Sequence, residues 1–187
     1  MKEVVLGVTG SIACYKSCDL VSQLRKDPGL RLHVVMTQEA TRFVSPLTFQ
    51  TLSGNRVYAD LFEAPEEWDL VHTSLSGKAD LVVVCPATVN VIGKLANGLC
   101  DDLLTCLLIA TKAPILMAPA MNQRMYEHPT TQGNIRKLKN LGVGFVGPIH
   151  GEMACREIGM GHLAEVADIA SAVRRRLGSA RRGKKAR

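Results

Sequence analysis

Leu81-Val82-Val83-Val84-Cys85 is apolar at every position, which is the pattern of a β-strand covered on both faces. Four more short apolar runs predict strands at 4–8, 32–36, 115–118 and 144–146. Helical patterns alternate with these runs, at 12–26, 89–96, 103–111, 130–141 and 164–177. Because strands and helices alternate, the sequence predicts an α/β fold with a Rossmann-like, doubly wound parallel sheet.

The composition indicates a single domain with a basic end. The chain has 187 residues, of which 47% are hydrophobic and only 4% aromatic, so aliphatic side chains must fill the core. Of the 23 Lys and Arg residues, eight lie at 174–187, which leaves 15 against 17 acidic residues. We therefore expect one domain at 1–177, followed at 178–187 by a basic disordered tail or a truncated linker. A nucleic-acid partner is not expected, because the tail has no aromatic side chains to stack on bases.

The cysteines and the apolar segments limit the location of the chain. The six cysteines form no C-x-x-C pair and no zinc-ligand spacing, so we expect free thiols and no metal site. The N-terminus enters a strand at once, unlike a signal peptide, and no apolar run approaches transmembrane length. These features predict a cytoplasmic protein without a membrane partner.

The turn after the first predicted strand suits a phosphate group. Gly10 permits a tight turn, and Ser11 stands near the start of the next helix, where free N–H groups favour an anion. The spacing is neither G-x-G-x-x-G nor a Walker loop, so it suits a mononucleotide better than a dinucleotide. Thr37, just after the second strand, could add a hydroxyl at the same edge. A plain turn at Ser11 and a helix N-cap at Thr37 are the structural alternatives.

Two further strand ends carry polar side chains. Thr88 and Asn90 follow the strand at 81–85, where a hydroxyl and an amide suit the edge of a flat heterocycle, although Thr88 is also a natural N-cap. Asn122 follows the strand at 115–118 and is flanked by Met121 and Met125. Carboxyl ends of parallel strands are where ligands bind in open α/β sheets, so Asn122 is a candidate to grip a small polar group in an apolar pocket.

Two residues outside these turns are candidates for proton transfer. His72 precedes the strand at 81–85, but a lone histidine is more often structural than catalytic. Cys155 lies in one of two predicted irregular stretches, 54–69 and 147–161, and the glycines of the second suit a flap over a site. Arg156 beside Cys155 would favour a thiolate, whereas an incidental exposed thiol is the alternative.

Taken together, these segments resemble the homo-oligomeric flavin-containing cysteine decarboxylases. The resemblance runs in order over about residues 2–165, and it is closest to the bacterial and archaeal enzyme of the coenzyme A pathway. Its motifs are Gly10-Ser11-Ile12-Ala13, the His72 segment, Pro86-Ala87-Thr88-Val89-Asn90, the run at 95–105, Pro119-Ala120-Met121-Asn122 and the Cys155 flap.

The resemblance implies a flavodoxin-like flavoprotein with bound FMN and with 4′-phosphopantothenoylcysteine as substrate, converted to 4′-phosphopantetheine and CO₂. It implies that His72 assists proton removal, Asn122 holds the substrate carboxylate region and Cys155 donates a proton in the final reduction. It also implies homotrimers or dodecamers and a fused or separate phosphopantothenoylcysteine synthetase. The implied FMN-binding residues are Gly10, Ser11, Ile12, Thr37, Pro86, Thr88, Val89, Asn90, Val91 and Ala120. The implied substrate-binding residues are Asn122, Met125, Glu152, Met153 and Ala154.

Three positions depart from the family pattern. Val91 stands where the family usually has a threonine, and Arg156 and His162 replace a glycine and an arginine of the flap. A peptidyl-cysteine decarboxylase, a prenyl-flavin-type transferase and a non-catalytic FMN-binding interaction subunit are the alternative functions. A dinucleotide-binding dehydrogenase is disfavoured, because no acidic residue ends the second predicted strand.

Overall fold

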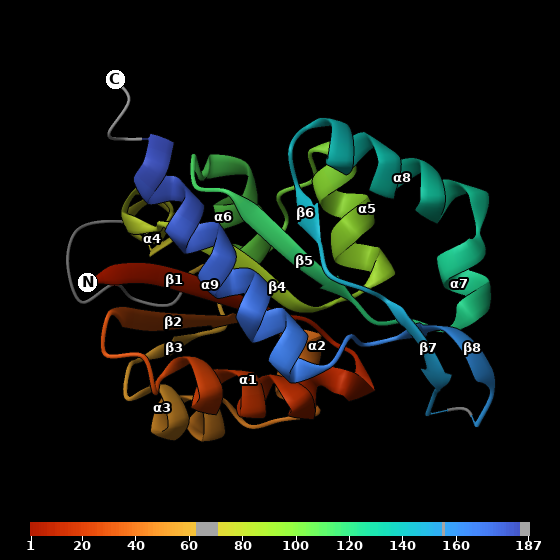
Figure 1. Ribbon diagram of the computed structural model, residues 1–187, viewed down its shortest axis with the longest axis horizontal. Coiled ribbons are helices and arrows are strands. Elements are labelled where there is room, and N and C mark those ends of the chain that lie inside the picture. Colours follow the sequence, from red (N-terminus) through yellow and green to blue (C-terminus); the bar gives the residue numbers. More distant parts are fainter. Residues whose placement is uncertain (63–70, 155, 184–187) are drawn as a thin grey trace.

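The described part of the chain forms a parallel sheet of six strands in the order β3-β2-β1-β4-β5-β6 (Figure 1). The computed structural model describes residues 1–62, 71–154 and 156–183, without the side chains of residues 71–72 and 179–183. The strand order reverses between β1 and β4, so the predicted doubly wound α/β fold is confirmed. The strands are β1 (Lys2–Val8), β2 (Leu30–Met36), β3 (Val57–Tyr58), β4 (Leu81–Ala87), β5 (Ile115–Pro119) and β6 (Gly144–Phe145).

Helices cover both faces of the sheet, and alternate strand residues supply two apolar cores. Leu81, Val83 and Cys85 pack into one core, whereas Val82 and Val84 pack into the other, which is why β4 is apolar throughout. In Figure 1, α9 crosses the first face beside α1. The first face carries α1 (Lys16–Leu24), α3 (Pro46–Ser53) and α9 (Val166–Gly183). The second carries α4 (Val71–Lys78), α5 (Val89–Asn97), α6 (Leu103–Ala110) and α8 (Pro129–Asn140).

A capping side chain starts a helix directly after each of four central strand ends. Ser11 caps the 3₁₀ helix η1 (Ile12–Tyr15), Thr37 caps α2 (Gln38–Thr41), Thr88 caps α5 and Asn122 caps α7 (Gln123–Glu127). Each side-chain oxygen accepts a hydrogen bond from a backbone N–H of the first turn, which fixes where the chain leaves the sheet. The polar side chains that the sequence placed at strand ends are therefore gathered at one edge of the sheet.

The stretch at 147–161 is more regular than predicted. The structure forms an antiparallel hairpin of β7 (Ile149–Glu152) and β8 (Ile158–His162), which extends beyond the sheet beside α7 (Figure 1). The prediction of an irregular stretch was wrong because Gly151, Gly159 and Gly161 weaken the strand signal of the hairpin, whereas cross-strand pairing holds the two strands together. The stretch at 54–69 likewise contains β3, and its residues 63–69 lie outside the description.

The last helix extends beyond its predicted end at residue 177. It continues to Gly183, because the residues that follow Leu177 include no proline, and Gly178 costs a helix only about 1 kcal/mol relative to alanine. Residues 178–183 of the predicted tail or linker are thus helical, and residues 184–187 lie outside the description. Within the described residues, no helix is both long and apolar enough to cross a membrane.

Candidate functional site

A cavity of about 340 Å³ opens at the carboxyl ends of β1, β2, β4 and β5, and we call it the sheet-edge cavity. Every residue that the sequence analysis assigned to the cofactor lines it, except Ile12 and Pro86. Met125, which was assigned to the substrate, also lines this cavity. Its lining residues are Thr9, Gly10, Ser11, Thr37, Glu39, Thr88, Val89, Asn90, Val91, Lys94, Asp102, Ala120, Met121 and Met125.

Thr9, which the sequence analysis did not single out, ties two walls of the cavity together. Its side chain is 2% exposed. The Thr9 hydroxyl donates to the carbonyl oxygen of Pro86 at 2.7 Å and accepts from the backbone N–H of Thr88 at 3.2 Å. Pro86 therefore contributes through its backbone, not as a cavity wall. A threonine directly after a buried strand was the only sequence signal for this role.

The turn after β1 makes a close approach to the segment after β2. A Cβ atom at Gly10 would overlap the side chain of Glu39, so only glycine fits there. Ser11 and Thr37 both cap helices, each accepting a hydrogen bond at 3.3 Å, from Ala13 and Ala40 respectively. The structural alternatives are thus realised, yet both residues also face the cavity, and their hydroxyl protons can still be donated to a bound oxyanion.

Val91, one of the departures from the family pattern, is part of the second core. Its side chain is 3% exposed and contributes only methyl groups to the cavity wall. The hydroxyl that the family usually places here is therefore lost, and Thr88 and Asn90 remain as the polar side chains of this turn.

Lys94 brings a cation into the sheet-edge cavity, where two carboxylates hold it. Its Nζ lies 2.7 Å from Asp101 Oδ1 and 3.0 Å from Asp102 Oδ2. Burial opposes the charge on Lys94, but the hydrogen bonds that it donates to Asp101 and Asp102 outweigh burial, so the pKa of Lys94 is raised above the usual value. The sequence analysis quoted these residues within motifs but missed the cluster, because the three come together only across the turn between α5 and α6.

A second, larger cavity of about 740 Å³ lies between the sheet edge and the hairpin, and we call it the hairpin groove. It shares Ser11, Ala120 and Met121 with the sheet-edge cavity, so the two spaces are neighbours. Ile12 lines this groove instead of the cavity to which it was assigned. The groove also gathers four predicted substrate residues, namely Asn122, Glu152, Met153 and Ala154.

Asn122 joins the sheet edge to the hairpin. Its Oδ1 accepts from the backbone N–H of Arg124 at 2.8 Å, and its Nδ2 donates to Glu157 Oε2 at 3.2 Å. The neighbouring Met121 donates its backbone N–H to the carbonyl oxygen of Gly161 at 3.0 Å. Gly161 has a φ of +140°, and a Cβ there would overlap the carbonyl oxygen of Met121. A glycine is therefore needed where β8 packs on the Asn122 segment.

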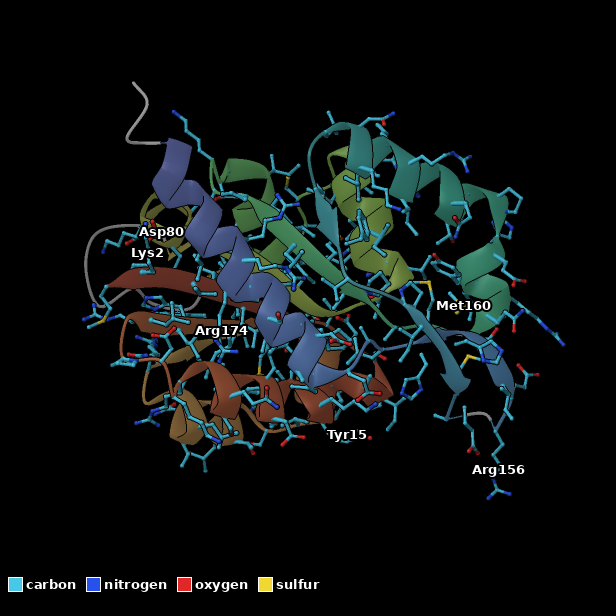
Figure 2. All side chains as sticks on the ribbon, in the orientation of Figure 1. Lys2, Tyr15, Asp80, Arg156, Met160 and Arg174 are labelled. Carbon is cyan, nitrogen blue, oxygen red and sulfur yellow. The ribbon has the colours of Figure 1, made fainter. Side chains whose placement is uncertain are left out.

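The tip of the hairpin has a backbone conformation that suits the glycine of the family pattern better than the arginine of this chain. Arg156 has a φ of +64°, in the left-handed region that glycine adopts without strain. Figure 2 shows its side chain at the outer end of the hairpin, pointing away from the body. Arg156 thus lines neither cavity, and its side chain is exposed to solvent.

The two remaining catalytic candidates stay predictions. His72 lies in α4, but its side chain is outside the description, and Cys155 lies outside the described residues altogether. Burial raises the pKa of Cys14 and of Cys85 to about 12, and burial also raises the pKa of Cys18 and Cys106. These four thiols are therefore protonated at neutral pH and are poor nucleophiles. Among the described residues, no cluster of three or more His, Cys, Asp or Glu is placed to hold a metal ion.

Hydroxyls, one amide and a close glycine turn at the carboxyl edge of a parallel sheet are the features of proteins that bind a phosphate-bearing planar cofactor. The family model described as "Flavoprotein" matches residues 1–178. The chain therefore belongs to the flavoprotein family, and the predicted flavin cofactor is supported.

Two curated relatives illustrate the likeness in sequence. The chain is 48% identical over 168 residues to the "Coenzyme A biosynthesis bifunctional protein CoaBC" of Bacillus subtilis, covering 90% of this chain but 41% of that protein. It is 39% identical over 178 residues to the "Probable phosphopantothenoylcysteine decarboxylase" of Streptococcus mutans, covering 94% of this chain and 99% of that protein. The chain thus spans about two fifths of the bifunctional relatives and nearly all of the shorter one.

Solved structures share the fold. A cysteine-to-serine mutant of PPC decarboxylase, complexed with pantothenoylaminoethenethiol, superposes with a TM-score of 0.84 at 31% identity, over 92% of this chain and 96% of that one. The FMN binding protein AtHal3 superposes with a TM-score of 0.81 at 31% identity, over 92% of this chain and 95% of that one.

Proposed function

We propose that this chain is the FMN-dependent decarboxylase that converts 4′-phosphopantothenoylcysteine to 4′-phosphopantetheine and CO₂ in coenzyme A biosynthesis. The observation that carries this proposal is the pair of neighbouring cavities, which meet at Ser11, Ala120 and Met121. One has the chemistry of a flavin site, and the other is a groove large enough for an extended substrate and lined on one side by the hairpin. The two names carried by the curated relatives support the same reaction.

The residues of the sheet-edge cavity fit FMN. Gly10, Ser11 and Thr37 offer a close backbone turn and two hydroxyls to the phosphate. Thr88 and Asn90 offer polar groups to the edge of the ring, while Val91, Ala120 and Met121 give it apolar walls. When bound, flavin supplies the reversible oxidation that a saturated cysteine carboxylate needs before it can lose CO₂.

The residues of the hairpin groove orient the substrate and exclude water. Asn122, fixed by its bonds to Arg124 and Glu157, holds the carboxylate region beside the sheet-edge cavity. Glu152, Met153 and Ala154 line the hairpin wall, which keeps water from the reacting carbon. Cys155, which follows that wall in sequence, donates the proton of the final reduction, and His72 assists the first proton removal.

The first test is mass spectrometry of the reaction products, after the visible spectrum has shown bound flavin. Appearance of 4′-phosphopantetheine is the expected result. If flavin is bound and this product is absent, a cysteine-ended peptide is tried next, and turnover of the peptide would overturn the proposed substrate. The Cys155→Ser variant should accumulate an oxidised intermediate, and full turnover by it would remove Cys155 from the proton-donor role.

We further propose self-association and a synthetase partner. Ile12, Tyr15 and Met125 are large apolar side chains that are 46–57% exposed beside the two cavities, which suits coverage by further copies of the chain. The bifunctional relatives suggest a phosphopantothenoylcysteine synthetase, fused or separate, as the next partner. Light scattering of the flavin-loaded protein tests the first proposal, because a monomeric mass contradicts it.

A further inference from the structure

A lysine and a histidine that meet in the hairpin groove have no role in the function described so far. Lys16 begins α1, and its Nζ lies 2.9 Å from Nε2 of His162, the last residue of β8. The other ring nitrogen, Nδ1, lies 2.7 Å from the carbonyl oxygen of Glu152. A carbonyl oxygen only accepts hydrogen bonds, so Nδ1 carries the proton and Nε2 accepts from the Lys16 ammonium. This arrangement fixes both the ring and the ammonium group.

The charge of Lys16 is not neutralised in the way that the charge of Lys94 is. Lys94 is held by two carboxylates, Asp101 and Asp102, so it brings little net positive charge to its cavity. Across the described ranges, no carboxylate lies within ion-pair distance of Lys16, and its polar contact is the neutral imidazole. Glu152 and Glu165 also line the groove but form no ion pair with Lys16, so its ammonium group can receive an anionic group of a ligand.

We propose that Lys16 and His162 bind the terminal phosphate of the substrate and make the reaction selective for the phosphorylated form, an inference that rests on the proposed function. The ammonium group has three protons and gives one to His162, so two remain for phosphate oxygens. His162 holds that ammonium group in place through Nε2, so it contributes to the phosphate site by positioning Lys16. Asn122, a neutral amide, then binds the carboxylate end of the substrate in the same groove.

The test compares steady-state kinetics with 4′-phosphopantothenoylcysteine and with its unphosphorylated counterpart, using flavin-loaded protein. Losing a charge-assisted hydrogen bond should raise KM for the phosphorylated substrate about 10- to 100-fold in Lys16→Met, with kcat unchanged. The unphosphorylated substrate should react equally well with both proteins. Lys16→Arg, which keeps the charge, should retain most of the selectivity, and His162→Gln should lose part of it. Lys26→Met, in an exposed turn outside both cavities, is the matched control.

An equal loss of kcat/KM with both substrates in Lys16→Met, or a loss in kcat alone, would overturn the proposal that Lys16 binds the phosphate. Calorimetric binding of 4′-phosphopantetheine and pantetheine separates this proposal from the proposed function, because it requires no turnover. If the wild-type protein decarboxylates neither substrate, but Lys16→Met abolishes its preference for 4′-phosphopantetheine, the phosphate site stands and the proposed reaction fails. If Lys16→Met weakens binding of the carboxylate-bearing substrate but not binding of 4′-phosphopantetheine, Lys16 binds the carboxylate and this inference is wrong. Should Lys16→Met fold poorly, the same comparison is made with His162→Gln.

Discussion

The sheet-edge cavity and the hairpin groove are neighbours, but they are held in different ways. The cavity is built from strand ends and capped helices, and its central hydrogen bonds come from Thr9, which is almost fully buried. The groove depends on contacts of the hairpin with the rest of the chain, such as Met121 with Gly161 and Lys16 with His162, and the side chains of Met121, Lys16 and His162 are only half-buried. The cavity is therefore part of the core, whereas the groove can be altered by changing a few contacts.

This comparison predicts that changes at the groove affect substrate chemistry and leave flavin in place. Asn122→Asp should have the largest effect, because aspartate keeps the helix cap but loses the Nδ2 donor and sets a carboxylate against Glu157. We expect the decarboxylation rate to fall about 10²- to 10³-fold, the typical cost of losing one positioned donor. The measurement is a turnover assay with the flavin content read from the visible spectrum.

Asn140→Asp, at the exposed end of α8, is the control for the Asn122 variant. It makes the same chemical change far from the contacts of the groove, so its turnover should equal that of the wild type. Loss of flavin from Asn122→Asp would instead assign Asn122 to the cofactor site and would blur the distinction between the two cavities.

Gly161→Ala should separate the hairpin from the Asn122 segment. The new methyl group would overlap the carbonyl oxygen of Met121 at a backbone φ of +140°, so we expect a loss of about 3 kcal/mol in stability. KM for the substrate should rise while flavin stays bound. Gly133→Ala, in α8 with open space around the new Cβ, should not destabilise the protein. Unfolding in urea measures the stability of both variants. Equal free energies of unfolding for Gly161→Ala and Gly133→Ala would contradict the packing argument.

Thr9→Val is the matching change in the sheet-edge cavity. It leaves the carbonyl oxygen of Pro86 and the N–H of Thr88 without their buried partner, which should cost about 2 kcal/mol of unfolding free energy. Flavin affinity should fall, whereas Thr9→Ser, which keeps the hydroxyl, should restore it. If Thr9→Val weakens only substrate binding, the two cavities are not held independently.

The strands that end at the cavity were easier to predict than the hairpin that lines the groove, for a physical reason. Carboxyl ends of parallel strands share one edge of the sheet, so finding the strands at 81–85 and 115–118 was enough to bring Thr88 and Ala120 together. The hairpin is defined by antiparallel pairing. Because glycine has a low strand propensity, a glycine-rich segment gives little sign of this pairing in its sequence. The two-residue β3 was missed because it is too short to show a period.

Contacts made through backbone atoms and long side chains left even weaker signals. The Thr9 bridge depends on the backbone of Pro86 and Thr88, and the Lys16–His162 contact spans 146 positions of the chain. Such pairs follow from the packed fold and not from any local pattern. The departures at Arg156 and His162 were visible in the sequence, but only the structure gave Arg156 a left-handed backbone and His162 a lysine partner.

Arg156→Gly should have the smallest effect and the opposite sign. An L side chain at a φ of +64° costs about 1 kcal/mol relative to glycine, and the backbone N–H of Arg156 already closes a turn onto the carbonyl oxygen of Met153 at 2.8 Å. Glycine should therefore strengthen the turn, and amide hydrogen exchange of β7 and β8 should slow severalfold while exchange in β1 and β4 stays unchanged. Arg156→Ala, which keeps the strain and removes the charge, is the control. Faster exchange in the glycine variant would mean that the side chain of Arg156, and not the turn, stabilises the hairpin. Arg156 would then be a stabilising residue, not one that the tip of the hairpin merely tolerates.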